Sequence, residues 1–343
     1  MSEDCCFLNK DALTFKYPKK SPLSMRVIVL SVVMICSVYI CSVCLKQIGT
    51  QSNLRLMKVI NHVEKPCHDP AIQGSEFPSV HYPEPTSYTR NECACNPVRL
   101  FAILSMQRSG SGWFETLLNS HVNVSSHGEI FSNKERRSNI TSITATLDKI
   151  YNLDWYSSAS KNECTAAVGL KWMLNQGLMK HHKEIVEYFN ERGVSVIILF
   201  RRNLLRRLVS ILANTHDREM KQLNGTHKAH VHSRAEAAVL AKYKPMINST
   251  ELITSLKDMD QWTASALKHF KSTHHMLLYY EDLISNRTKL LDVQEFLGLP
   301  PSQLVSRHVK IHTKPLSEQV QNWDAIYNVL KRTQYASLLT VDY

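Results

Sequence analysis

Residues 100–114, LFAILSMQRSGSGWF, join an apolar run to a short turn with two glycines and then to a helical pattern. A strand, a turn and a helix in this order make an anion cradle, because free backbone N–H groups and the helix dipole point at the same space. The spacing differs from the G-x-x-x-x-G-K-[ST] loop that holds nucleoside triphosphates, and its cation, Arg108, precedes the glycines. The stretch therefore predicts a site for a phosphate-like group other than the tail of ATP.

Later apolar runs indicate that this first strand belongs to a parallel sheet. Runs typical of strands buried on both faces are residues 166–170, 194–200 and 276–280. Helical patterns between and after them are residues 179–190, 252–270 and 286–297. The alternation predicts an α/β fold over residues 98–343, a P-loop-like parallel sheet flanked by helices. Ligands of such sheets bind at the carboxyl ends of the strands, where the turn at Arg108 lies.

The first hundred residues are organised differently. Residues 27–45 are nineteen residues without a charge, long enough to span a bilayer and too long for an ordinary buried core helix. No small-residue cleavage pattern follows, which disfavours a cleaved signal peptide. Lys and Arg are more frequent just before this run than just after it, so residues 1–26 are expected in the cytosol. Six prolines make residues 46–97 a predicted luminal stem.

Two features of the chain beyond the predicted anchor agree with a luminal location. Five N-x-[ST] sequons begin at Asn123, Asn139, Asn224, Asn248 and Asn286. Two disulfides, with three possible pairings left open, are permitted by Cys67, Cys93, Cys95 and Cys164. The net charge of +11 over 343 residues favours acidic surfaces or anionic ligands as partners.

A second cationic motif follows the apolar run 194–200. Asn203 suits the N-cap of a helix, and Ser210 lies seven residues later, about two turns on and on the same side. Arg202 leaves the carboxyl end of the predicted strand, where a guanidinium fork suits a phosphate. We therefore expect Arg202 and Ser210 to meet one anion. For Arg206 and Arg207 we favour a simple solvated helix face.

The pairing of QRSGSGWF with R-N-x-x-x-x-x-x-S resembles the sulfotransferase superfamily, whose donor is 3′-phosphoadenosine 5′-phosphosulfate (PAPS). Because its first loop carries arginine, the chain is similar to Golgi carbohydrate and nodulation-type members, over about residues 98–339. Segments that also resemble family motifs are residues 278–283, 296–299, 314–316 and 322–323. The resemblance implies that the 5′-phosphosulfate is bound by Arg108, Ser109, Gly110, Ser111, Gly112 and Trp113. It implies that Arg202 and Ser210 bind the 3′-phosphate, with Lys314 near the donor's phosphates.

Transfer of a sulfuryl group to a hydroxyl needs a group that accepts the hydroxyl proton. Glu129 resembles the glutamate proposed as general base in nodulation-type and carbohydrate sulfotransferases. His127 is the rival, because imidazole has a suitable unperturbed pKa. Lys171, at the end of the second predicted strand, either neutralises the transferring group or caps the strand at the surface.

The sequence thus predicts a single-pass Golgi enzyme that transfers a sulfuryl group from PAPS to a hydroxyl or amino group of a glycan. No metal and no nucleic acid are expected to take part, and the acceptor and oligomeric state stay open. One alternative is a glycosyltransferase, since a D-x-D pattern occurs at Asp258 and Asp260, although inside a predicted helix. Another is a non-catalytic luminal protein with the same fold. A mobile surface loop rather than a metal site is expected for His227, His230 and His232.

Overall fold

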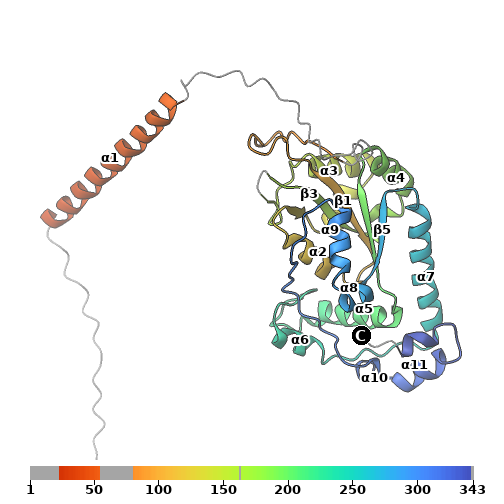
Figure 1. The fold of residues 1–343 in the computed structure, drawn as a ribbon. Coiled ribbons are helices and arrows are strands. Elements are labelled where there is room, and N and C mark those ends of the chain that lie inside the picture. The colour runs from red at the N-terminus through yellow and green to blue at the C-terminus, as the bar shows by residue number, and fades with distance from the viewer. Residues whose placement is uncertain (1–22, 55–79, 162–163, 341–343) are drawn as a thin grey trace, which may run out of the picture. The chain divides into compact units, whose positions relative to one another are not determined.

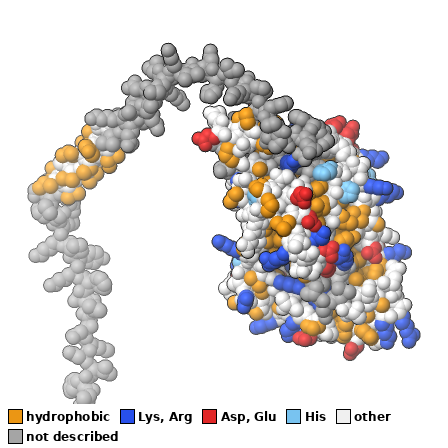
Figure 2. Space-filling view, in the orientation of Figure 1, with side chains coloured by type: hydrophobic (Ala, Val, Ile, Leu, Met, Phe, Trp, Pro, Cys, Tyr) orange, Lys and Arg blue, Asp and Glu red, His pale blue; other side chains and the backbone are white. Residues whose placement is uncertain are grey.

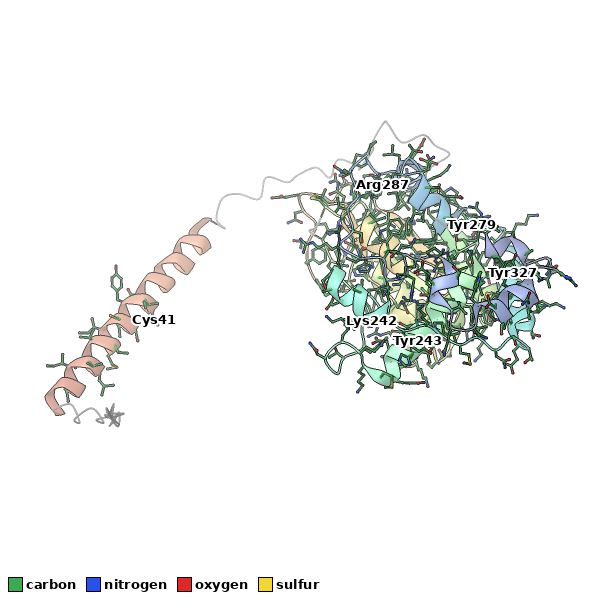
Figure 3. The ribbon with its side chains drawn as sticks, turned by 90° about the horizontal axis from the view of Figure 1, so that it is seen from below. Cys41, Lys242, Tyr243, Tyr279, Arg287 and Tyr327 are labelled. Atoms are coloured by element: carbon green, nitrogen blue, oxygen red, sulfur yellow. A yellow bond between two sulfur atoms is a disulfide. The ribbon has the colours of Figure 1, made fainter. Side chains whose placement is uncertain are left out.

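The computed structural model describes residues 23–54, 80–161 and 164–340. The chain divides into two compact units, residues 1–66 and 67–343. In the first unit, α1 (Leu23–Leu54) has its side chains described over residues 27–42, and these are exposed and mostly hydrophobic (Figures 2 and 3). Within the described residues, no helix meets the length and apolarity needed to cross a membrane. Residues 1–22 of the predicted cytosolic tail and residues 55–79 of the predicted stem lie outside the described residues, whereas residues 46–54, predicted as stem, continue α1.

The larger unit contains a five-stranded parallel sheet in the order β2-β3-β1-β4-β5 (Figure 1). Its strands are β1 (Arg99–Ser105), β2 (Val124–Ser126), β3 (Ala167–Met173), β4 (Ser195–Phe200) and β5 (His275–Tyr279). The predicted parallel sheet is confirmed. The sequence did not predict β2, because its three residues are too few to show a period.

Helices cover both faces of this sheet (Figure 1). The helices described in this unit are α2 (Ser111–Asn119), α3 (Ile140–Tyr151), α4 (His182–Glu191), α5 (Leu204–Met220), α6 (Arg234–Leu240), α7 (Leu252–His269), α8 (Tyr280–Ser285), α9 (Lys289–Phe296), α10 (Leu316–Gln319) and α11 (Trp323–Leu330). Of these, α3, α4 and α7 pack on one face, and α2 and α9 on the other. The helical patterns at 179–190 and 252–270 correspond to α4 and α7. The pattern at 286–297 corresponds to α9, which begins three residues later than expected.

Alternate residues of β1 point into two different cores, as expected of a strand covered on both sides. Leu100 and Leu104 pack in a cluster with residues of α3, α4 and α7, whereas Phe101 and Ile103 pack in a cluster with residues of α2 and α9. All four side chains are buried. Packing on both faces thereby holds β1 in place. Because the turn at Arg108 directly follows the carboxyl end of β1, its position is also set by this packing.

A disulfide joins Cys93, ahead of β1, to Cys164, ahead of β3. Cys95 is also disulfide-bonded, and Cys67 lies outside the described residues. The bond settles the partner of Cys93, which the sequence left open. It ties together the amino ends of the two strands whose carboxyl ends carry the candidate site.

Candidate active site

The turn between β1 and α2 has a backbone that few residues tolerate. Arg108 has φ 64° and Gly110 has φ 86°, both in the left-handed region. A Cβ on Gly110 would lie 2.3 Å from the Tyr280 ring, and one on Gly112 would lie 2.4 Å from the His230 ring. No side chain caps the start of α2, so its first N–H groups are left for a ligand. The two glycines are needed because neighbouring side chains come so close to this turn.

A cavity of about 470 Å³ opens in front of this turn. Its walls come from the turn, from the carboxyl ends of β3 and β4, from α5, and from two later segments, residues 227–231 and 308–312. The predicted site residues among its walls are Arg108, Gly110, Ser111, Gly112, Trp113, Glu129, Lys171 and Ser210. The structure therefore brings most of the predicted residues to one cavity, at the edge of the sheet where ligands bind.

Arg108 connects the two predicted cationic motifs. Its Nε donates to Ser210 Oγ at 2.9 Å, and its Nη1 donates to the carbonyl oxygen of Ala229 at 2.8 Å. Desolvation, together with the nearby Arg201 guanidinium, lowers the pKa of Arg108 to about 10. Arg108 is still protonated at neutral pH, so it offers a charge that little water screens.

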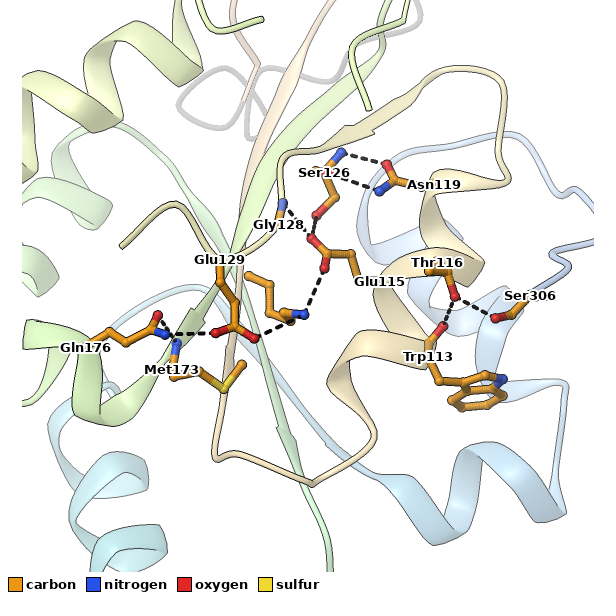
Figure 4. Close-up of polar contacts among 11 residues, drawn as sticks. Trp113, Glu115, Thr116, Asn119, Ser126, Gly128, Glu129, Met173, Gln176 and Ser306 are labelled. Carbon is orange, nitrogen blue, oxygen red and sulfur yellow. Dashed lines mark hydrogen bonds and ion pairs between the residues drawn. The ribbon is translucent and has the colours of Figure 1, made fainter. Parts of the chain in front are cut away.

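Glu129 also faces the cavity, between two polar partners (Figure 4). Lys171 Nζ lies 3.4 Å from Glu129 Oε1, and Gln176 Nε2 donates to Glu129 Oε2 at 2.8 Å. Gln176 is itself held in place, because its Oε1 accepts from the Met173 N–H and its carbonyl oxygen accepts from Trp172 Nε1. The Glu129 side chain is 36% exposed, so it is oriented by these contacts yet open to a ligand.

A family model for the sulfotransferase domain matches residues 100–328. The chain belongs to the sulfotransferase family. Nodulation protein H of Rhizobium meliloti is 27% identical over 241 residues, which are 66% of this chain and 89% of that protein, and the strain 1021 protein matches equally. The superfamily that the two motifs resemble is thereby confirmed.

Two solved structures are similar in fold to this sulfotransferase. Mouse sulfotransferase SULT7A1 complexed with PAP has a TM-score of 0.33 and 11% identity, over 59% of this chain and 60% of that one. A sulfotransferase from Alicyclobacillus acidocaldarius has a TM-score of 0.37 and 13% identity, over 71% of this chain and 96% of that one.

Four predicted site residues of this sulfotransferase lie outside the cavity walls: Ser109, His127, Arg202 and Lys314. Lys314 pairs with Glu318 at 3.0 Å, and its side chain is 66% exposed. His127 shares a hydrogen bond of 2.8 Å with Ser157, and burial lowers its pKa to about 4. Of the two candidate bases, Glu129 is therefore the one that reaches the cavity. Ser109 belongs to the turn itself, and its buried hydroxyl has no partner among the described residues.

Arg202 points away from the cavity in this sulfotransferase. Its guanidinium is bound by the carboxylate of Asp282, with Nη2 2.8 Å from Oδ2, and lies 4.0 Å over the Tyr279 ring labelled in Figure 3. The hydrogen bond with Asp282 raises the pKa of Arg202. Arg201 lines the cavity instead. The assignment of Arg202 to the 3′-phosphate stays a prediction, and it requires Arg202 to leave Asp282.

Two further arginines differ from expectation. Arg206 and Arg207 were expected on a solvated helix face, but they are 4% and 7% exposed. Arg206 donates to the carbonyl oxygen of Lys314 at 3.3 Å, and Arg207 donates to that of Gln107 at 2.8 Å. The solvated helix face was the wrong interpretation, because these guanidinium groups are buried and bind the backbone of the loops around the cavity.

The histidine-containing segment also differs from the predicted surface loop. His227 and His230 line the cavity, and only His232 does not. The backbone N–H of Val309 donates to the carbonyl oxygen of Val231 at 2.9 Å, which joins this segment to residues 308–312. The latter segment adds His308 and His312 to the cavity walls. Neither segment has a periodic pattern, so the sequence carried no signal that they meet.

Proposed function

We propose that this protein transfers a sulfuryl group from PAPS to a hydroxyl or amino group of a glycan or glycoconjugate. The observation that carries the proposal is the contact between Arg108 and Ser210. It brings the two motifs that resemble donor-binding segments to one cavity, which Glu129 and Lys171 also line.

The residues at the turn fit an anionic donor. The first-turn N–H groups of α2 are uncapped, and Arg108, Arg201 and Lys171 supply positive charge beside them. Glu129 is the one Asp or Glu among the cavity walls. When bound, PAPS supplies an activated sulfuryl group whose leaving group is adenosine 3′,5′-bisphosphate. Three cations near the reacting group make a metal ion unnecessary for charge neutralisation in this proposal.

Glu129 is the group proposed to handle the acceptor's proton. A carboxylate that faces the cavity and is held by Lys171 and Gln176 can accept a hydroxyl proton as the acceptor oxygen attacks. Lys171, 3.4 Å from Glu129, supplies a positive charge that can stabilise the negative charge that develops on the departing bisphosphate oxygen. The two side chains therefore divide proton transfer and charge stabilisation between them.

The location proposed for the enzyme is the Golgi lumen, with residues 27–45 as a single-pass anchor. Support comes from the uncharged run itself, from the five sequons beyond it, and from the Cys93–Cys164 disulfide, which is typical of an oxidising compartment. Protease protection of tagged protein in microsomes tests the orientation. Digestion of residues 98–343 in sealed vesicles would refute it.

The function is tested by incubating the purified full-length protein, in detergent, with ³⁵S-labelled PAPS and a panel of glycans. We expect label on at least one glycan, with equal rates in the presence and absence of a chelator. Labelled sugar nucleotides in place of PAPS test the glycosyltransferase alternative. Transfer from sugar nucleotides alone, or no binding of adenosine 3′,5′-bisphosphate by calorimetry, would refute the proposal.

Arg201 and Arg202 form a matched pair for locating the 3′-phosphate. We expect Arg201→Ala to weaken binding of adenosine 3′,5′-bisphosphate by about 10- to 100-fold, because a hydrogen bond to a charged group contributes about 1.5–3 kcal/mol. Calorimetry on both variants measures this. An equal loss in Arg202→Ala would show that the phosphate draws Arg202 from Asp282. Unchanged affinity in both would place the phosphate elsewhere.

His312 is expected to gain a proton when the bisphosphate binds. Desolvation and the nearby Arg108, Arg201 and Arg206 lower the pKa of His312 to about 4, so it is neutral in the free protein. An anion beside it favours the imidazolium, so the complex binds more protons than the free protein does. Calorimetry in buffers of different ionisation heat measures proton uptake near pH 6, which also includes the ionisation of the phosphates themselves. His312→Gln should reduce that uptake, and full uptake in this variant would contradict the assignment.

A further inference from the structure

Behind Glu129 and Lys171 lies a third charged group, the carboxylate of Glu115 on α2 (Figure 4). Glu115 is 7% exposed. Its Oε1 accepts hydrogen bonds from the Ser126 hydroxyl at 2.7 Å and from the Gly128 N–H at 2.8 Å. Its Oε2 lies 3.1 Å from Lys171 Nζ. One buried carboxylate therefore holds both the turn that leads to Glu129 and the cation beside Glu129.

Lys171 is shared unequally between the two carboxylates. Its contact with Glu115, at 3.1 Å, is shorter than its contact with Glu129, at 3.4 Å. Glu115 is also the more buried of the two, and a buried carboxylate without its partner is strongly destabilised. The backbone N–H of Lys171 additionally donates to the carbonyl oxygen of Gly128 at 3.1 Å. Glu115 thus holds Lys171 at a fixed place while Glu129 faces the cavity.

We propose that Glu115 is a positioning residue for sulfuryl transfer, holding Lys171 and the Gly128 N–H so that Glu129 faces the acceptor in one orientation. Glu115 is not among the cavity walls, so it acts through Lys171 and Gly128 and does not touch the substrate. The inference rests on the proposed function, because that function makes Glu129 the base.

The charged groups around Lys171 determine its pKa, and therefore how the loss of the Glu115 charge changes the pH dependence of activity. Burial by itself lowers the pKa of Lys171, but Glu115 and Glu129 more than offset this and raise it above its usual value. His230 and His308 also act on Lys171 from the later segments, and desolvation lowers the pKa of both, so they are neutral above pH 7. Removing the Glu115 charge therefore lowers the pKa of Lys171. The altered enzyme should lose its Lys171 proton, and its activity, at a lower pH than the wild type.

Glu115→Gln in the full-length protein tests the proposal, because glutamine keeps the shape and one acceptor oxygen but loses the charge that faces Lys171. We expect kcat to fall by about 10- to 100-fold, as for a small misplacement of a reacting group. Activity should also fall at an alkaline pH where the wild type is still active. Affinity for adenosine 3′,5′-bisphosphate should stay within about twofold. Thermal unfolding verifies that the variant is folded.

Ser126→Ala is the matched control. It removes one hydrogen bond to Glu115 Oε1 and leaves the contact with Lys171, so kcat should stay within about threefold. In a Lys171→Met background, Glu115→Gln should cause little further loss, because the charge through which it acts is gone. If Glu115→Gln does not fold, Glu115→Asp takes its place. Aspartate keeps the charge but is shorter, so we expect a lower kcat and the same decline of activity at alkaline pH as in the wild type.

Three results would overturn the positioning role. One is an additive fall in kcat when Glu115→Gln is combined with Lys171→Met. The others are activity in folded Glu115→Gln that declines at the same alkaline pH as in the wild type, or a fall in kcat in Ser126→Ala as large as that in Glu115→Gln. Alkaline loss of activity in Glu115→Asp would do the same, because that variant keeps the charge. Failure of the proposed function looks different. A wild-type protein that neither binds the bisphosphate nor transfers sulfate refutes that function without any variant.

Discussion

Arg108→Ala should lower kcat/KM for sulfate transfer by about 10³-fold or more. The guanidinium lies between the uncapped start of α2 and Ser210, so its loss removes charge from both proposed ends of the donor site. Each hydrogen bond from a charged group contributes about 1.5–3 kcal/mol, and two such bonds account for the expected effect. Initial rates at several PAPS concentrations measure it, and calorimetry with adenosine 3′,5′-bisphosphate separates binding from turnover.

Arg108→Lys is the matched control for this substitution. Lysine keeps the positive charge and the Cβ, so the cost of φ 64° at this position is the same in wild type and both variants. A point charge cannot reproduce the contacts to Ser210 and Ala229 together. We expect Arg108→Lys to retain part of the activity, between wild type and alanine. Wild-type kinetics in folded Arg108→Ala would remove the first loop from the donor site.

Glu129→Gln should lower kcat by about 10²- to 10⁴-fold, the usual contribution of a general base. Glutamine has the same shape but only one acceptor oxygen, so it keeps one of the two contacts with Gln176 and Lys171, and its amide accepts no proton at neutral pH. Affinity for adenosine 3′,5′-bisphosphate should stay within about threefold, because the proposed donor site consists of the first loop, Arg201 and Ser210, which line the same cavity. Single-turnover rates of sulfate transfer measure the chemical step directly.

His127→Gln provides the comparison for this second substitution. His127 is bonded to Ser157 and is not among the cavity walls, so we expect its rate to stay within about threefold of wild type. A large fall in kcat in His127→Gln, together with wild-type kcat in Glu129→Gln, would make His127 the general base in place of Glu129. Loss of both affinity and rate in Glu129→Gln would instead indicate a binding role for Glu129.

The sequence predicted the elements whose pattern is local. The strands at β1, β3 and β4 are apolar runs because both faces of the sheet are covered there, and the first turn shows its glycines directly. β5 is apolar too, but it lies at the edge of the sheet with Leu277 exposed, so burial on both faces was the wrong prediction for it. The N-cap at Asn203 is confirmed, since its side chain accepts from the Arg206 N–H at 2.9 Å. These features depend on residues within a few positions of one another, which a sequence shows.

Features that depend on distant contacts were not predictable in the same way. Arg201 and Arg202 are neighbours, and the one that enters the cavity is decided by Asp282 on α8, which draws Arg202 aside. The partners of Glu115 come from β3 and from the turn after β2, so the sequence shows only a polar residue within an apolar helix. Residues 227–231 and 308–312 meet across almost eighty positions of the chain, through Val231 and Val309.

The bond between Val231 and Val309 has a practical consequence for anyone who shortens this enzyme for crystallisation or assay. A protein ending near residue 300 would retain every strand and still lack one side of the reaction chamber, together with two of its histidines. Such a fragment would also lose α10 and α11, whose apolar side chains share a core with α5. Expression boundaries should therefore extend to residue 340, beyond the segments that pack on α5.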